Sequence, residues 1–141
     1  MTRPMTVRRT DPPGLPAAPG LISQVVTVTG GRLVHLSGQV AQDETGTPTG
    51  GDHAAQAAAV ARNIDTALAA AGATRDDVVK ETIYVVDYTP DILRPVLAAL
   101  RDGVRTVPAS TLVPVPVLFA PGYLLEVDVT AALPAPAPAP D

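Results

Sequence analysis

The sequence predicts one α+β domain in which two helices pack on one face of a β-sheet. Three observations support this fold class. Five β-branched or apolar runs and two segments with helical spacing of apolar residues follow one another in the order ββαβαββ. A length of 141 residues suits a single domain. A hydrophobic share of 46% is well above that of disordered chains.

The first two strands are expected at residues 25–29 and 33–40. Gly30 and Gly31 separate these β-branched runs, which is typical of a tight hairpin. Residues 1–19 are polar and rich in proline, so we expect a flexible N-terminal arm. Residues 134–141 alternate proline with alanine up to the final Asp, which favours a polyproline-like tail. The folded domain is therefore expected to cover residues 20–133.

Residues 43–51 form a turn-rich loop, and the first helix is expected directly after it. Asp52 can cap the helix at its N-terminus, and Gly72 can end it after Ala71. Val60, Ile64 and Leu68 recur at helical spacing and predict the buried face.

The second helix is expected between Thr89-Pro90 and Gly103. Thr89 is a suitable cap, and proline is well tolerated in the first turn. Pro95 lies inside this segment, so it should bend the helix or shift its start.

The remaining strands are expected at residues 78–86, 110–117 and 123–131. Pro114 and Pro116 are two residues apart in the second of these, so both missing N–H groups lie toward the same edge. That edge should be unpaired or bulged. The strands also carry apolar residues on both sides, which a chain of this size cannot cover alone. We therefore expect an oligomer.

Composition argues against several classes of protein. A net charge of −4 and a single lysine, Lys80, disfavour a phosphate-binding or nucleic-acid-binding surface. The chain has no cysteine, hence no disulfide or thiolate nucleophile. We find no metal-ligand spacing, no nucleotide motif, no secretory signal and no apolar run long enough for a membrane span. A cytoplasmic protein without a cofactor is expected.

Glu126 is the strongest candidate for a catalytic residue. It lies in the middle of an apolar strand, and no cation occurs between Thr106 and Glu126 to pair with it. A carboxylate in an apolar site gains a partner, reaches solvent or takes up a proton. A carboxyl group poised between these states can act as a general acid or base. The alternative is that Glu126 lies on a solvated face of the strand.

An ordered set of short motifs resembles the RidA/YjgF family over most of the chain. These motifs are Ser37-Gly38-Gln39-Val40, Gln56, Asn63, Ala71-Gly72-Ala73, Asp77-Val78-Val79-Lys80, Tyr84-Val85-Val86-Asp87, Pro108-Ala109 and Leu125-Glu126-Val127-Asp128. The resemblance implies a chorismate-mutase-like fold, a homotrimer and pockets between subunits. The best-known members hydrolyse reactive imines and enamines made from amino acids. In those enzymes the residue that matches Glu126 activates or holds the attacking water.

The chain departs from the family at the residue that follows Pro108-Ala109. Family members that deaminate imino acids hold the substrate carboxylate with an arginine there, whereas this chain has Ser110. A hydroxyl cannot form a bidentate, charge-assisted clamp. We therefore expect a mostly apolar pocket and a neutral or apolar substrate. The expected substrate-binding residues are Ser110, Thr111, Gly38, Ser37, Gln39, Leu112, Ile22, Tyr123 and Phe119.

Three functions remain open on the sequence. The first is an enzyme that uses Glu126 as acid and base on a neutral imine, enamine or related small molecule, by hydrolysis, tautomerisation, dehydration or cyclisation. The second is a deaminase of 2-imino acids in which Arg105 or another group replaces the missing arginine. The third is a non-catalytic trimer that binds ligands or acts like a chaperone.

Overall fold

The computed structural model describes residues 3–141 of the chain. Two short 3-10 helices span Arg75–Asp77 and Pro90–Ile92. The strands and α-helices are β1 (Thr6–Thr10), β2 (Val25–Thr29), β3 (Arg32–His35), α1 (His53–Ala70), β4 (Val78–Val85), α2 (Leu93–Arg101), β5 (Ala109–Pro114) and β6 (Leu125–Leu133).

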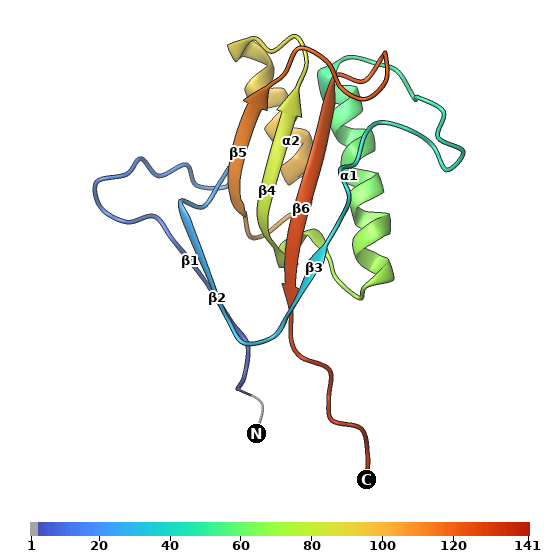
Figure 1. Ribbon diagram of the computed structural model, residues 1–141. Helices are drawn as coiled ribbons and strands as arrows, with labels where there is room; N and C mark the ends of the chain where they lie inside the picture. Colours follow the sequence, from blue (N-terminus) through green and yellow to red (C-terminus); the bar gives the residue numbers. More distant parts are fainter. Residues whose placement is uncertain (1–2) are drawn as a thin grey trace.

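The main sheet has four strands in the order β3-β6-β4-β5. β4 and β5 run parallel, and the β3–β6 and β4–β6 pairs are antiparallel. Both helices cover the same face of this sheet, and the opposite face is open (Figure 1). The predicted α+β class with two helices on one face is confirmed.

Both helices follow the predicted local signals. Asp52 caps α1 by accepting a hydrogen bond from the Ala55 N–H at 2.9 Å, and Gly72 follows its C-terminus with a φ of 77°. In the second segment the chain first forms a 3-10 turn at Pro90–Ile92, and α2 begins at Leu93. Pro95 therefore lies in the first turn of α2, where its missing N–H costs no helical hydrogen bond.

The expected hairpin between residues 25–29 and 33–40 does not form. β2 instead pairs with β1 in a separate two-stranded sheet, whereas β3 pairs with β6 (Figure 1). Gly30 and Gly31 make the corner between the sheets, both with positive φ. A Cβ atom at Gly31 would lie 2.5 Å from the Leu133 carbonyl oxygen and 2.7 Å from the Met5 sulfur. The glycines thus permit close contact with two distant segments rather than a tight turn.

The N-terminal arm contains a strand, contrary to the expectation of a loose segment. Thr6–Thr10 pair with β2 along five registered positions. The Arg9 guanidinium anchors this strand by donating to the carbonyls of Val107 at 3.2 Å, Asp76 at 3.2 Å and Val78 at 3.1 Å. These partners are far along the chain, so the local sequence could not indicate the contacts that anchor the strand. By contrast, residues 134–141 contain neither helix nor strand.

The two faces of the main sheet differ sharply in polarity. Alternate residues of β4 and β6, such as Ile83, Val85 and Val127, are buried under the helices. The open face instead carries hydroxyls and charged groups, listed by strand as Lys80, Thr82, Tyr84, Glu126, Asp128 and Thr130. The argument that apolar side chains on both faces require a second subunit is therefore wrong for β4 and β6.

β5 is an edge strand, as its prolines predicted. Val115 N–H donates to the Val85 carbonyl at 2.9 Å, so Pro114 and Pro116 direct their missing donors away from β4. Within residues 3–141, no helix is both long enough and apolar enough to cross a membrane.

Candidate active site

An irregularity in the pairing of the β3 strand with β6 brings Gly38 onto Glu126. Leu36 N–H donates to the Val129 carbonyl at 3.1 Å, and Gln39 exchanges backbone hydrogen bonds with Val127 at 2.8 and 3.0 Å. Between these hydrogen bonds the chain advances three residues from Leu36 to Gln39, whereas β6 advances only two from Val129 to Val127. One extra residue opposite a regular strand is a β-bulge. The bulge ends the regular strand at His35, short of the predicted Val40.

Glu126 lies on the open face of β6, with the Gly38 backbone packed against its side chain. A Cβ atom at Gly38 would be 2.8 Å from Glu126 Cδ and 2.9 Å from Glu126 Oε2. Tyr84 is the cross-strand neighbour of Glu126 on β4, and Asp128 follows on the same face. Glu126 is half-buried, so part of this residue is exposed on the open face.

The other polar residues predicted for the pocket lie near the same open face. The side-chain amide of Gln39 donates to the Ser37 carbonyl at 3.0 Å, within the bulge. Thr111 is exposed on β5 and accepts a hydrogen bond from Lys80 Nζ at 3.0 Å. Ser37, Gly38 and Gln39 thus lie together in the bulge beside β6, and Gly38 is the one that approaches Glu126.

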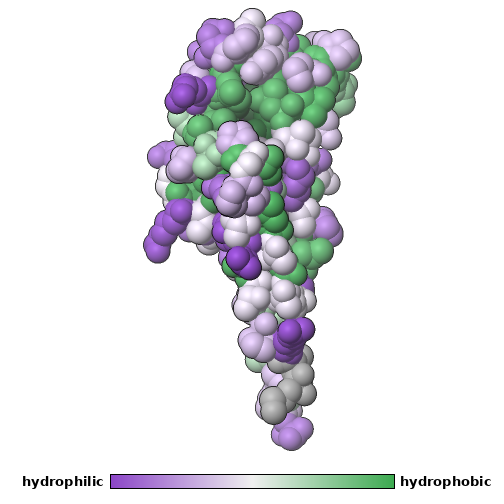
Figure 2. Space-filling view, turned by 90° about the vertical axis from the view of Figure 1, so that its left-hand side faces the viewer, coloured by the Kyte–Doolittle hydropathy of each residue, from purple (hydrophilic) through white to green (hydrophobic). Residues whose placement is uncertain are grey.

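A second set of predicted residues lines a cavity on the helix side of the sheet edge. Ile22, Ser110 and Leu112 share a cavity of about 260 Å³ with side chains of α2 and of the segment before β2. The remaining lining residues are Ala18, Leu21, Ile83, Leu93 and Leu97. Figure 2 shows this side of the molecule, with hydrophobic residues gathered around a hollow in its upper part. The expectation of an apolar pocket around Ser110 is consistent with this lining.

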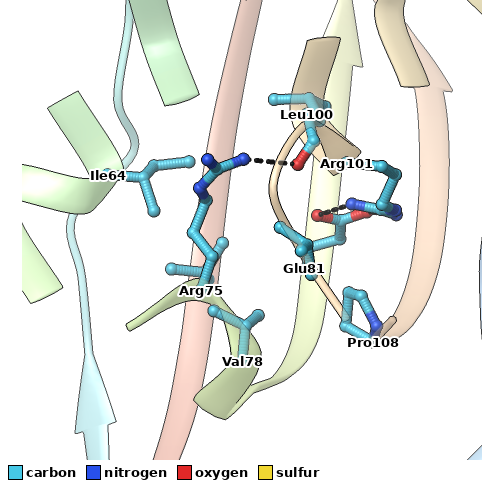
Figure 3. A pocket seen from close by; sticks show the side chains of 9 residues that line it. Ile64, Arg75, Val78, Glu81, Leu100, Arg101 and Pro108 are labelled. Carbon is cyan, nitrogen blue, oxygen red and sulfur yellow. Dashed lines mark hydrogen bonds and ion pairs between the residues drawn. The ribbon is translucent and has the colours of Figure 1, made fainter. Parts of the chain in front are cut away.

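Ser110 forms a hydrogen bond with one member of an ion pair that the sequence did not predict. Its hydroxyl donates to Glu81 Oε1 at 2.8 Å, and Glu81 is paired in turn with Arg101 (Figure 3). The side chains of Arg101 and Glu81 are only 9% and 5% exposed. Glu81 lies between Lys80 and Thr82, so it lacks the apolar, cation-free surroundings that singled out Glu126, and its cation comes from α2.

Phe119 and Tyr123 lie apart from both groups. Their ring centroids are 5.1 Å apart, and they line a separate cavity of about 400 Å³ formed by the loop between β5 and β6. The Tyr123 hydroxyl donates to Gln42 Oε1 at 3.1 Å, whereas Phe119 is 70% exposed.

The sheet therefore divides the predicted site within one chain. In the parallel β4–β5 pair Ser110 is registered with Glu81 and Leu112 with Ile83, which places both under the helices. Glu126 lies on the opposite face of β6. One small molecule cannot contact Glu126 and Ser110 of the same chain. Across residues 3–141 no cluster of three or more His, Asp or Glu side chains is arranged to hold a metal ion.

Comparison with known proteins agrees with the motifs found in the sequence. Residues 15–133 match the family model described as Endoribonuclease L-PSP. A Rid-family protein of unknown function, YyfB from Yersinia pestis, is 34% identical with a TM-score of 0.82, covering 90% of this chain and 98% of that one. RidA from the Antarctic bacterium Psychrobacter sp. PAMC 21119 is 32% identical with a TM-score of 0.65, covering 84% and 93%.

Among curated proteins, DfrA of Myxococcus xanthus is 41% identical over 73 residues. That alignment spans 51% of this chain and 56% of DfrA, so it concerns about half of each protein. The family match covers most of the chain, and the solved structures share its fold. The chain therefore belongs to the Endoribonuclease L-PSP family, the RidA/YjgF family that its motifs resemble.

Proposed function

We propose that this protein is a small-molecule enzyme that hydrolyses a neutral, mostly apolar imine or enamine, with Glu126 as general acid and base. The observation that supports this most directly is the contact between Gly38 and Glu126. Gly38 lies in the β-bulge and has no side chain, so its backbone packs directly against the Glu126 carboxylate on the open face of the sheet. Groups held in this way are suited to transfer protons at a defined position.

The chemistry requires one proton acceptor that later becomes a donor. The Glu126 carboxylate takes a proton from water as the water oxygen attacks the imine carbon. The protonated Glu126 returns this proton to the imine nitrogen, which gives a carbinolamine. The carboxylate then takes the O–H proton of the carbinolamine and passes it to nitrogen as the carbon–nitrogen single bond breaks, so that a carbonyl compound and ammonia are released. Tautomerisation of an enamine uses the same residue in the same two states.

We propose further that the complete site forms between two copies of the chain. Glu126 and Gly38 lie on the open face of the sheet, and the apolar cavity at Ser110 and Leu112 lies under the helices at its edge. A second copy could bring its own Glu126 to the first copy's cavity. This arrangement agrees with the homotrimer that the family resemblance implies.

The environment of Ser110 disfavours the alternative of a 2-imino acid deaminase. Arg105 is not among the residues that line the Ser110 cavity, and its backbone N–H donates to Asp76. Arg101 is close, but its guanidinium is bound to Glu81 and to the Leu21 carbonyl. A substrate carboxylate would have to displace Glu81 from this pair, which is costly for a buried charge.

Cleavage of RNA, which the family description suggests, is disfavoured by charge. Asp128 lies on the same face as Glu126, and the chain has a net charge of −4. A phosphodiester backbone would be repelled by this surface. We expect no cleavage of a single-stranded RNA by the purified protein.

Two imines that differ only in the carboxylate provide the test. An amino acid oxidase generates the imino acid from leucine, and a flavin-dependent amine oxidase generates the carboxylate-free imine from isoamylamine. Trapping of free imine by semicarbazide reports how fast the protein removes it. We expect acceleration with the isoamylamine product and little with the leucine product. The reverse preference would establish the deaminase, and no acceleration with either would favour the non-catalytic binder.

Complementation tests the shared site. Glu126→Gln and Leu112→Trp variants, each folded as judged by its melting temperature, should both be inactive alone. Co-expressed with different tags, they should assemble into mixed oligomers in which roughly a quarter of sites combine two unmodified halves by random assortment. Recovery of that share of activity is the expected result. Complete absence of recovery in purified mixed oligomers would contradict a site built from two chains.

A further inference from the structure

We infer that the Glu81–Arg101 ion pair makes Ser110 a hydrogen-bond acceptor toward the cavity, so that this cavity selects small apolar molecules carrying one N–H or O–H donor. This deepens the proposed function by naming the chemical class that the binding half of the site takes. It rests on the proposed function only for the statement that such a molecule is a substrate, because the binding preference is a property of the cavity itself.

Each of the three nitrogens of the Arg101 guanidinium donates a hydrogen bond within the fold. Nε donates to the Leu21 carbonyl at 2.7 Å, Nη1 donates to Glu81 Oε2 at 3.1 Å, and Nη2 donates to Glu81 Oε1. This is a two-point arginine–carboxylate contact, the geometry of a charge-assisted ion pair. Both side chains are nearly inaccessible to water, so no solvent molecule competes for these hydrogen bonds.

An ionised carboxylate can only accept hydrogen bonds, and this determines the direction of the bond with Ser110. The Ser110 hydroxyl must donate its proton to Glu81 Oε1, at 2.8 Å. A serine hydroxyl has one proton and two lone pairs. With the proton committed to Glu81, only lone pairs remain for a molecule in the cavity.

Ser110 is the only polar side chain among the residues that line the cavity. The others are aliphatic residues of α2, β4, β5 and the segment around Leu21, and the volume of this open cavity is about 260 Å³. A carboxylate or ketone oxygen placed at Ser110 would meet another acceptor and find no proton. A group with an N–H or O–H would complete a hydrogen bond there, and its apolar body would displace water from aliphatic walls.

The ion pair therefore determines the ligand preference by orienting the Ser110 hydroxyl, without contacting the ligand itself. Replacement of the pair by apolar residues of similar size should release the Ser110 proton. The Ser110 hydroxyl would then be free to donate as well as to accept a hydrogen bond. The cavity of this variant should therefore bind molecules that carry an acceptor, in addition to molecules that carry a donor.

Two matched pairs of ligands test these statements by NMR titration of the full-length protein. Indole and benzofuran have nearly the same shape, but only indole has an N–H donor. Acetophenone and α-methylstyrene differ mainly in a carbonyl acceptor. We expect the protein to bind indole roughly three- to tenfold more tightly than benzofuran, and to bind acetophenone no more tightly than α-methylstyrene.

Two variants assign the effect to the named residues. Ser110→Ala should keep benzofuran binding and abolish the preference for indole. The double variant Glu81→Leu/Arg101→Met should gain a preference for acetophenone over α-methylstyrene. A tighter complex of the unmodified protein with acetophenone, an indole preference that survives in Ser110→Ala, or no binding of any of the four molecules would each overturn the inference.

A different observation would contradict the proposed function. In Glu126→Gln we expect the ratio of indole to benzofuran affinities to stay above one, because Ser110 is unmodified and the amide oxygen of glutamine still accepts hydrogen bonds. If the ratio is found as expected but Glu126→Gln retains full imine hydrolysis, the selectivity of the cavity stands and the catalytic assignment falls.

Discussion

The Gly38 backbone lies so close to the Glu126 carboxylate that no side chain fits between them. A Cβ atom at position 38 would be within 2.9 Å of Glu126 Cγ, Cδ and Oε2. The conflict would fall on the end of a half-buried side chain, which can rotate away. The glycine therefore defines the position of the carboxylate more than it supports the fold.

Gly38→Ala should separate stability from activity. The φ angle of Gly38 is not positive, so alanine is compatible with the backbone, and we expect a change in unfolding free energy below about 1 kcal/mol. Displacement of the carboxylate should lower the rate of imine hydrolysis by about a hundredfold. Thermal melting and the semicarbazide assay provide the two measurements. Loss of folding without a specific loss of rate would assign Gly38 a structural role.

Glu126→Gln should preserve the fold and remove proton transfer. The amide of glutamine has nearly the same shape as the carboxylate, and Glu126 is only half-buried, so the substitution should not strain the fold. We expect an activity loss of about 10²- to 10⁴-fold at an unchanged melting temperature. Asp128→Asn, on the same face of β6, is the matched control and should retain most activity. Equal losses in both variants would point to a general effect of charge.

Substitutions of Glu81 and Arg101 should have strongly non-additive effects on the unfolding free energy. Arg101→Met leaves a buried carboxylate without its cation, so we expect it to lower the unfolding free energy by about 3–5 kcal/mol. The double variant Glu81→Leu/Arg101→Met removes both charges and should recover most of that loss. Urea denaturation of the single and double variants measures the coupling. Additive losses would mean that the two charges stabilise the fold independently.

Arg9 should hold the N-terminal strand on the domain. Burial lowers the pKa of its guanidinium, opposed by the nearby charges of Asp76 and Asp77, and the three carbonyl contacts compensate for part of this burial. Arg9→Met should cost about 1–3 kcal/mol and speed amide exchange across β1 and β2. Arg8→Met is the control, because Arg8 is the exposed neighbour on the same strand. Equal exchange rates in the two variants would show that β1 is held by strand pairing alone.

The hydrogen bonds of the loop at residues 43–47 should depend on pH through the Asp43 carboxylate. The Thr45 hydroxyl and the N–H groups of Thr47 and Thr45 donate to its carboxylate and lower its pKa. A lowered folded-state pKa adds stability at pH values above the ordinary aspartate pKa of about 3.9, and this is lost as the pH falls through the folded value. NMR titration should show the Thr45 and Thr47 amides shifting below about pH 4. The same shifts in Asp43→Asn would exclude Asp43 as their source.

The local elements of this protein were determined by its sequence alone. The cap at Asp52, the stop at Gly72, the shifted start of α2 at Pro95 and the unpaired edge at Pro114 follow from interactions within a few residues. Such interactions are the same in any fold that contains the segment. The ordered set of motifs between Ser37 and Asp128 likewise sufficed to identify the family.

Only the tertiary structure decided which segments meet. β2 pairs with β1 rather than β3, Arg9 reaches the loop before β5, and Glu81 finds its cation on α2. Each choice joins residues far apart in the chain, where several partners of equal local propensity compete and global packing selects one. The same selection put Ser110 and Glu126 on opposite faces of the sheet, because a strand's register and pairing determine which face each side chain occupies.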